Sequence, residues 1–307
     1  MIQGVKGFVA LCVAVCVMAV VAAPRRALGG DLVATMNGVT IKAPRTVYEG
    51  QPFFVRITSE KALDAAEMVW QEKRVPLDVA PAAGGGCEAV ALLGVGLQRN
   101  ATSQPLRVTA HGTAGDADIA MVVAVARKKY PEQKLNVDGK FVDLSATDMA
   151  RATEERKLVV KALETITPRR FWLCPFVRPV PGAVTSDYGL RRIYNGQPRN
   201  PHSGVDFRAA MGSPVHAAAA GRVVLLGDFF FGGNEVFIDH GQGVVSVYVH
   251  MSEVMVKDGQ EVKAGDVVGL VGSSGRATGP HLHFGLNVLR NAIDPMPLFE
   301  QRCGERQ

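Results

Sequence analysis

The stretch GPHLHFG, residues 279–285, decides the fold of the C-terminal half of this sequence. His281 and His283, two of the seven histidines of the chain, stand one residue apart inside this apolar run. Successive side chains of a β-strand point to opposite faces, so the two imidazoles would share a face at a Cα separation of about 7 Å. The opposite face would carry the apolar side chains Leu282, Phe284 and Leu286. The stretch therefore predicts a strand with a core side and a side that presents two histidines.

A second strand-like run, VVSVYVH at residues 244–250, alternates in the same way. Its alternation would place Ser246, Tyr248 and His250 on one face and three valines on the other. We expect the valines to lie in the core and the polar face to form the floor of a groove. This adds His250 to the candidate site.

A third cluster, PHSGVDF at residues 201–207, contains His202 and Asp206. In an ideal strand their Cα atoms would lie about 13 Å apart, too far to share an ion. A bend at Ser203-Gly204 would bring them together, because glycine tolerates positive φ. Zinc binds nitrogen and oxygen donors at about 2.0–2.2 Å, and two histidines with one carboxylate leave a fourth position open for water.

The sequence around these clusters is dense in strand patterns separated by glycine turns, which predicts an all-β domain over residues 183–300. Residues 31–128 also consist of short strand patterns with turn signals, typical of an Ig-like β-sandwich. His111 stands alone there and is expected on the surface. The chain is therefore predicted to be mainly β, with two β domains.

Residues 129–182 are predicted to connect the two domains. The segment 145–166 has a helical period of apolar residues, and Ser145 with Asp148 forms a capping box. Its charged run, residues 154–157, is expected to be a solvated face without a site. Pro168 ends the helix, and a proline-rich linker follows over 170–182.

The composition fits a globular protein, with 47% hydrophobic residues, 33 Gly and 17 Pro among 307 residues. The formal charge is +5, and residues 1–30 contribute +3 of it without any acid, so residues 31–307 carry 5 − 3 = +2. This small excess, without a basic run interleaved with aromatic residues, argues against a nucleic-acid partner.

Residues 1–30 match a secretory signal peptide. Lys6 precedes an uncharged apolar run, residues 8–23, and small residues follow at 27–29. We expect export to the periplasm or cell envelope and no stable membrane span after processing, because the run is shorter than the roughly 20 residues that a span needs. An uncleaved anchor helix is the alternative.

The cysteines exclude a full disulfide framework. Cys12 and Cys16 would leave with the signal peptide, and Cys87, Cys174 and Cys303 would remain. An odd number leaves at least one thiol unpaired. Cys174 and Cys303 flank the C-terminal half and could pair.

Over about residues 183–297 the sequence resembles the LytM/lysostaphin-type zinc endopeptidases of bacterial cell walls. The His-x-x-x-Asp motif, the Tyr-x-His segment and the His-x-His pair occur in the family's order, with matching glycine turns between them. Arg191 fits a family pattern through YGLR, residues 188–191, and is expected to be structural or to line the groove. The chain departs from the family at Met251, where leucine is usual, and at Ser274, where threonine is usual.

The resemblance implies a role for each of five residues, none of which is substituted. His202, Asp206 and His283 would bind one Zn²⁺ per chain. His281 would face the zinc-bound water and the substrate. His250 would be the second catalytic histidine, and which of the two histidines is the base stays open.

The implied function is that of a zinc-dependent peptidoglycan endopeptidase, a hydrolase of the peptide cross-links of the cell wall. One alternative is a non-catalytic wall-binding activator of a partner amidase, which would be expected to have lost metal ligands. Another is a lipoyl- or biotinyl-type carrier, suggested by residues 255–275, but a carrier needs a lysine at the hairpin tip where this run has Ser273-Ser274-Gly275. Residues 31–128 could bind the wall, dock a partner or cover the groove.

Overall fold

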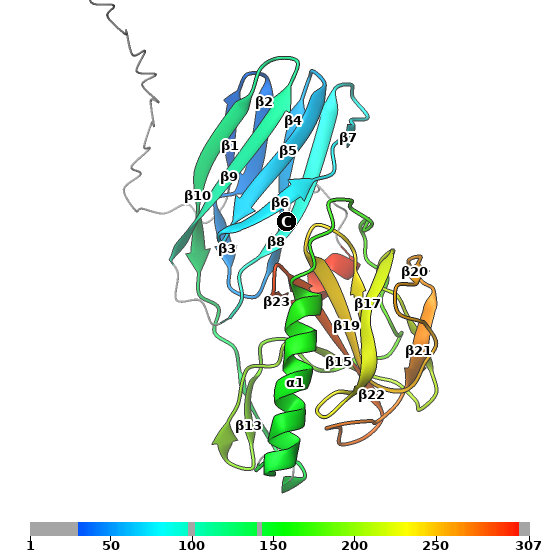
Figure 1. Ribbon diagram of the computed structural model, residues 1–307. Coiled ribbons are helices and arrows are strands. Elements are labelled where there is room, and N and C mark those ends of the chain that lie inside the picture. The colour runs from blue at the N-terminus through cyan, green and yellow to red at the C-terminus, as the bar shows by residue number, and fades with distance from the viewer. Residues whose placement is uncertain (1–29, 98–101, 140–142, 301–307) are drawn as a thin grey trace, which may run out of the picture.

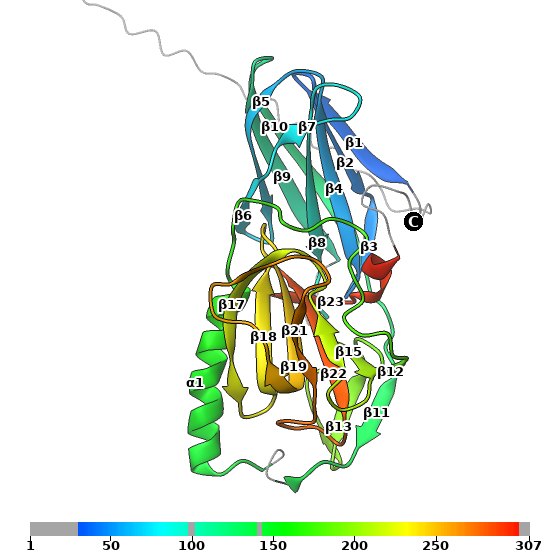
Figure 2. The same cartoon turned by 90° about the vertical axis from the view of Figure 1, so that its right-hand side faces the viewer.

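The computed structural model describes residues 30–97, 102–139 and 143–300. Within these ranges the protein is mainly β, with an N-terminal sandwich and a C-terminal sheet arranged end to end (Figures 1 and 2). This confirms the prediction of a mainly β fold; the Ig-like character of the sandwich stays a prediction. The predicted signal peptide lies outside the described residues, except for Gly30.

Two five-stranded sheets pack face to face in the N-terminal region (Figure 1). In spatial order, the first sheet consists of β1 (Asp31–Met36), β2 (Val39–Pro44), β4 (Pro52–Ser59), β8 (Cys87–Gly94) and β7 (Ala80–Pro81). The second consists of β3 (Thr46–Tyr48), β10 (Ala117–Ala126), β9 (Ser103–Gly112), β5 (Leu63–Trp70) and β6 (Lys73–Leu77).

The sandwich core follows from strict alternation along these strands. In β2 every second side chain is buried, and Ile41 is fully enclosed. Trp70 and Met68 enter the same core from the other sheet, also fully enclosed. Full burial of one such side chain stabilises the fold by about 1.5–3 kcal/mol. His111 is exposed on β9, as predicted.

The connector holds the α-helix of the described residues, α1 (Ala146–Leu163), which lies beside β17 (Figures 1 and 2). Ser145 caps it by accepting a hydrogen bond from the backbone N–H of Asp148, as the sequence predicted. The predicted apolar stripe is only partly buried: Ala162 is enclosed, whereas Met149 is 54% exposed. Only the C-terminal half of the stripe therefore packs on the protein. No helix in the described ranges is long and apolar enough to cross a membrane.

A ten-stranded sheet forms the C-terminal region (Figure 2). Its path is β12 (Val184–Ser186), β15 (Gly204–Arg208), β22 (His281–Val288), β19 (Val244–Val254), β18 (Gly233–Asp239), β17 (Gly221–Phe229) and β20 (Glu261–Val262). Attached to it are β16 (Pro214–His216), β21 (Val267–Val271) and β23 (Asn291–Ile293), and a short 3₁₀ helix η2 (Met296–Phe299) follows. A small separate sheet joins β11 (Glu132–Leu135) of the connector to β13 (Arg191–Tyr194) and β14 (Gln197–Pro198).

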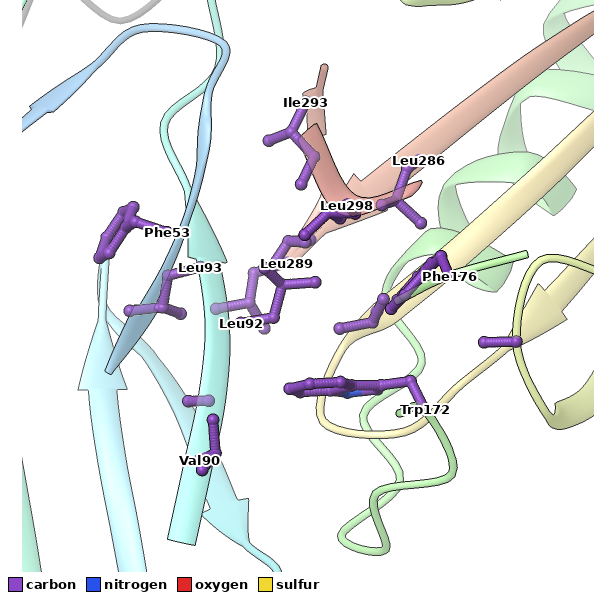
Figure 3. Close-up of a cluster of buried hydrophobic side chains, with 14 of the residues drawn as sticks. Phe53, Val90, Leu92, Leu93, Trp172, Phe176, Leu286, Leu289, Ile293 and Leu298 are labelled. Atoms are coloured by element: carbon purple, nitrogen blue, oxygen red, sulfur yellow. The ribbon is translucent and has the colours of Figure 1, made fainter. Parts of the chain in front are cut away.

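The sandwich and the ten-stranded sheet meet at an apolar cluster (Figure 3). Leu92 of β8 faces Leu289 and Trp172, which are 3% and 0% exposed, whereas Leu93 points the other way, toward Phe53 inside the sandwich. Beside the cluster, Asn291 donates a hydrogen bond of 2.8 Å to the side-chain oxygen of Gln71. The two regions therefore share one continuous core.

Two hairpin turns contribute to this interface, and both have strained backbones. Gln71 and Glu72, between β5 and β6, have φ of 50° and 66°, and Leu289 and Arg290, between β22 and β23, have φ of 50° and 67°. Residues other than glycine rarely adopt this conformation. Burial of Leu289 and the bond to Gln71 hold the turns in it.

Of the cysteines in the described ranges, Cys87 is a free thiol and Cys174 is disulfide-bonded. A free thiol agrees with the odd count. The expected partner, Cys303, lies outside the described residues.

Candidate metal centre

Strand pairing brings the three expected ligands together. β15 and β22 are antiparallel, and Asp206 stands directly opposite His283 in their register. His202 lies two residues before β15, and its ring nitrogen Nε2 lies beside Asp206 and His283. Gly204 does not adopt the positive φ that we expected there. Asp206 Oδ1 is 3.0 Å from His202 Nε2 and 2.8 Å from His283 Nδ1, and the two ring nitrogens are 2.9 Å apart.

The donor chemistry of this cluster fits a cation. His202 Nδ1 lies 2.7 Å from the carbonyl oxygen of Asp187, which cannot donate, so Nδ1 carries the proton and Nε2 presents a lone pair. That lone pair faces a carboxylate oxygen and a second ring nitrogen. Three donor atoms that converge in a buried place repel one another unless a positive ion lies between them. Two imidazole nitrogens and one carboxylate oxygen are a set that zinc accepts.

The charge states of the cluster agree with ligand chemistry. Burial lowers the pKa of His202 to about 4, so its ring is neutral near pH 7. For Asp206, burial opposes ionisation, but the adjoining imidazoles of His202 and His283 outweigh it and hold the pKa of the carboxyl far below its usual range. A metal binds deprotonated ligands, and these two residues already have that form.

Arg192 holds the second carboxylate oxygen of Asp206. Its Nη2 donates 2.9 Å to Asp206 Oδ2 and 3.0 Å to Ser186 Oγ, and its Nη1 donates 3.0 Å to the hydroxyl of Tyr194. The pair is largely enclosed, with side-chain exposures of 14% and 11%. Arg192 therefore fixes the orientation of Asp206. The residue that the sequence singled out, Arg191, is instead 65% exposed and pairs with Glu132.

His250 and His281 face the cluster with their rings 4.8 Å apart. His250 Nδ1 lies 2.8 Å from the carbonyl oxygen of Ser274, and His281 Nδ1 lies 2.8 Å from that of Gly279. Both Nδ1 atoms must donate, so both Nε2 atoms present lone pairs. Residues 273–280, which we call the histidine loop, thus orient both rings.

The predicted orientation of β19 was wrong. Tyr248 is fully enclosed and packs against Phe284 in the core, whereas Val247 and Val249 line the groove. Tyr248 enters the core because the backbone N–H of Ala218 donates 2.7 Å to its hydroxyl and satisfies it. His250 nevertheless reaches the groove because its φ of 67° interrupts the alternation. This left-handed conformation costs a non-glycine residue about 1–3 kcal/mol and is typical of functional sites.

The cluster lies in a groove of about 1030 Å³. One wall is α1, with Ala152, Glu155 and Val159, and the opposite wall includes Arg192 and Tyr194 of β13. None of the described residues of 31–128 lines it. Glu155 was expected in a solvated run without a site, but it lines this groove and accepts a hydrogen bond of 2.7 Å from the backbone N–H of Phe230.

Glu235 is a further buried acid of the groove, 8% exposed. Burial, with a smaller contribution from the charge of Glu155, raises its pKa to about 8. The carboxyl is therefore largely protonated near pH 7. Its position on β18 gave no signal in the sequence, because an acid inside a strand pattern normally marks the solvent face.

The structure thus brings together all five predicted site residues and leaves the other histidines outside the groove. His216 and His240 lie elsewhere and bind backbone carbonyl oxygens through Nδ1, at 2.8 Å and 2.7 Å.

The sequence patterns did not predict the roles of Arg192 and of the backbone carbonyls of Asp187, Ser274 and Gly279. The alternation of β13, which puts Arg192 and Tyr194 on one face, was the available signal for the first. Backbone carbonyls have no signal in a sequence.

Comparisons with known proteins agree on one family. Residues 200–295 match the model of Peptidase family M23. A crystal structure of an M23 peptidase from Pseudomonas aeruginosa is similar with a TM-score of 0.58 and 30% identity, over 77% of this chain and 88% of that chain.

Curated relatives support the same assignment. The chain is 31% identical over 183 residues to the peptidoglycan DD-endopeptidase ShyA of Vibrio cholerae, over 59% of this chain and 38% of the relative. It is 40% identical over 113 residues to the DD-carboxypeptidase/endopeptidase Mpg of Neisseria meningitidis, over 37% of this chain and 26% of the relative. The chain therefore spans about two fifths or less of the length of these curated relatives.

Proposed function

The chain belongs to peptidase family M23, and we propose that it is a metalloendopeptidase that hydrolyses the peptide cross-links of peptidoglycan with one zinc ion per chain. His202, Asp206 and His283 are the proposed ligands. His250 and His281 are the proposed catalytic histidines. The relatives named as peptidoglycan DD-endopeptidases support the substrate, and the D,D cross-link is the first bond to test.

The observation that carries the proposal is the convergence of His202, Asp206 and His283, whose donor atoms all lie within 4.8 Å of one another. Zinc bound there would polarise the scissile carbonyl and lower the pKa of a water molecule to about 7. The groove remains open beside the cluster, so a peptide can reach it.

His250 and His281 are placed to move protons. Each has a lone pair on Nε2 that faces the groove, because its Nδ1 is held by a backbone carbonyl. One ring can accept the proton from the attacking water and return it to the leaving amine, and the other can donate to the oxyanion once it is protonated. Fixed rings do not have to reorganise during the reaction.

Arg192 is a positioning residue in this scheme. It occupies Asp206 Oδ2, so Oδ1 is left to face the metal position. A hydrogen bond to the outer oxygen of a ligating carboxylate fixes its geometry and typically contributes 10- to 100-fold to metal affinity or activity.

The test is digestion of wall sacculi by residues 31–307. New amino groups should appear, mass spectrometry should identify the peptide bond cleaved, chelation should stop the release, and added zinc should restore it. Release that is indifferent to chelation, or a protein that takes up no zinc, would contradict the proposal.

The non-catalytic activator remains the alternative function, and the intact set of five residues does not favour it. It predicts that His283→Ala leaves the cellular phenotype unchanged. The metallopeptidase predicts that this variant behaves like a deletion.

A further inference from the structure

Arg276, in the histidine loop, is held between two aromatic rings in the groove. Its guanidinium carbon lies 4.8 Å from the ring centroid of Tyr194 and 4.7 Å from that of Phe231. Its backbone N–H donates 2.7 Å to the carbonyl oxygen of Phe231. A planar guanidinium between two rings is fixed in orientation, while its N–H groups at the edge stay available.

A short chain of contacts connects Arg276 to the candidate metal centre. Tyr194, under its guanidinium, accepts a hydrogen bond from Arg192, and Arg192 binds the carboxylate of Asp206. The same loop holds His250 through Ser274 and His281 through Gly279. Arg276 therefore lines the same groove as the candidate metal centre and belongs to the loop that orients both proposed catalytic histidines.

The charge of Arg276 has no matching carboxylate. None of the ion pairs among the described residues involves it. Burial lowers the pKa of Arg276, and so do the nearby charges of Arg192 and Arg199, which line the same groove. A partly buried cation beside two others is unfavourable on its own and becomes favourable when an anion binds.

We propose that Arg276 binds a free carboxylate on the residue next to the scissile bond, so that the enzyme selects peptides that carry this carboxylate. The inference rests on the proposed peptidase function and deepens it. Two parallel N–H donors of a fixed guanidinium match the two oxygens of a carboxylate, whereas a carboxamide offers only one acceptor oxygen.

The experiment compares two synthetic peptides that contain a peptide bond between two D-residues. They differ only in the α-carboxylate of the residue after that bond, which is free in one and amidated in the other. A charge-assisted contact predicts that kcat/KM for the free acid exceeds that for the amide by about 10- to 100-fold. Arg276→Gln should reduce this ratio to near 1, and Arg276→Lys should retain part of it.

Arg191→Gln is the matched control, because Arg191 is a largely exposed arginine on β13. It should leave the ratio unchanged. Equal rates on the two peptides with the wild-type enzyme, or an unchanged ratio in Arg276→Gln, would overturn the proposal. A fall in both rates without a change of ratio would assign Arg276 a structural role and would also overturn it.

A binding measurement distinguishes the failure of the carboxylate site from the failure of the proposed peptidase function. Calorimetry of the metal-free protein should show about 10-fold tighter binding of the free-acid peptide, and Arg276→Gln should abolish the difference. If neither peptide is cleaved but this binding preference is present, the peptidase proposal fails and the carboxylate site stands. If both peptides are cleaved without a preference, only the carboxylate site fails.

Discussion

The sandwich and the ten-stranded sheet are built from similar strands but treat buried polar groups differently. Of the buried polar side chains in the described ranges, Glu49, Ser59 and Gln71 belong to residues 31–128. Residues 183–300 contain ten: Ser186, His202, Asp206, Glu235, Asp239, His240, Gln242, Ser246, His250 and Asn291. Burial of a polar group costs free energy unless a partner satisfies it.

In this mainly β protein, the region with many buried polar side chains is the one that contains the candidate site. The sandwich places apolar groups inside and polar groups outside with little exception. Residues 183–300 instead enclose several imidazoles and carboxyls, and His250 has a left-handed conformation there.

The largest effect is expected from His283→Ala. Loss of one of three ligands should abolish zinc uptake and reduce sacculus hydrolysis by at least about 10⁴-fold. Zinc content and release of amino groups are the measurements. His111→Ala, on the surface of the sandwich, is the reference and should change neither. A His283→Ala protein that keeps its zinc would show that the ligand assignment is wrong.

His250→Ala and His281→Ala should each reduce hydrolysis by about 10²- to 10⁴-fold, because a positioned proton-transfer group is lost. Unlike His283→Ala, both variants should keep one zinc per chain. Parallel metal analysis and kinetics would establish this. Loss of zinc in either variant would make that histidine a ligand. His216→Ala is the control within the same sheet.

Arg192→Gln should weaken zinc affinity or activity by about 10- to 100-fold, because Asp206 loses the donor that fixes its outer oxygen. Competition with a fluorescent chelator measures the affinity directly. Arg191→Gln should change it less than 2-fold, since this neighbour reaches only Glu132 on the surface. Equal effects of the two substitutions would contradict the role of Arg192 in positioning Asp206.

Glu235→Gln should have the smallest effect on activity. Its main effect should be on the way in which the free energy of unfolding depends on pH. Burial raises the pKa of Glu235 in the folded protein to about 8, from an ordinary value of 4.5. The stability that comes from the neutral carboxyl is therefore fully present below pH 4.5 and is lost as the pH rises through 8. We expect the wild-type protein to lose a few kcal/mol between pH 5 and pH 9 through this group.

Urea unfolding at a series of pH values measures this loss. Glu235→Gln should have a flatter stability profile over the same interval, because glutamine does not ionise. Two parallel profiles would show that Glu235 ionises in the folded protein as it does in the unfolded chain.

Much of this architecture could be predicted from residue patterns. The capped helix, the core side of β22 and the five site residues follow from periodicity, from the Ser-x-x-Asp cap and from the family motifs. These features depend on local spacing or on residues that lie close in the sequence.

The other features of the site depend on contacts between residues that are distant in the sequence, and local patterns do not reveal these contacts. The orientation of β19 was predicted wrongly because Tyr248 is satisfied by the backbone of Ala218, thirty positions away. The choice of Arg192 over Arg191 is made by the pairing of β13 with neighbouring strands. The roles of Ser274 and Gly279 are carried by backbone oxygens, which every residue has.

The hairpin turns at Gln71-Glu72 and Leu289-Arg290 determine whether the sandwich and the ten-stranded sheet can be separated as stable fragments. Leu289 is buried against β8, and Asn291 is bound to Gln71, so we expect the two regions to unfold cooperatively rather than as independent modules. Expression of residues 129–300 without the sandwich would expose an apolar surface that includes Trp172 and Ile293. A soluble fragment without the sandwich would therefore need polar replacements at those positions.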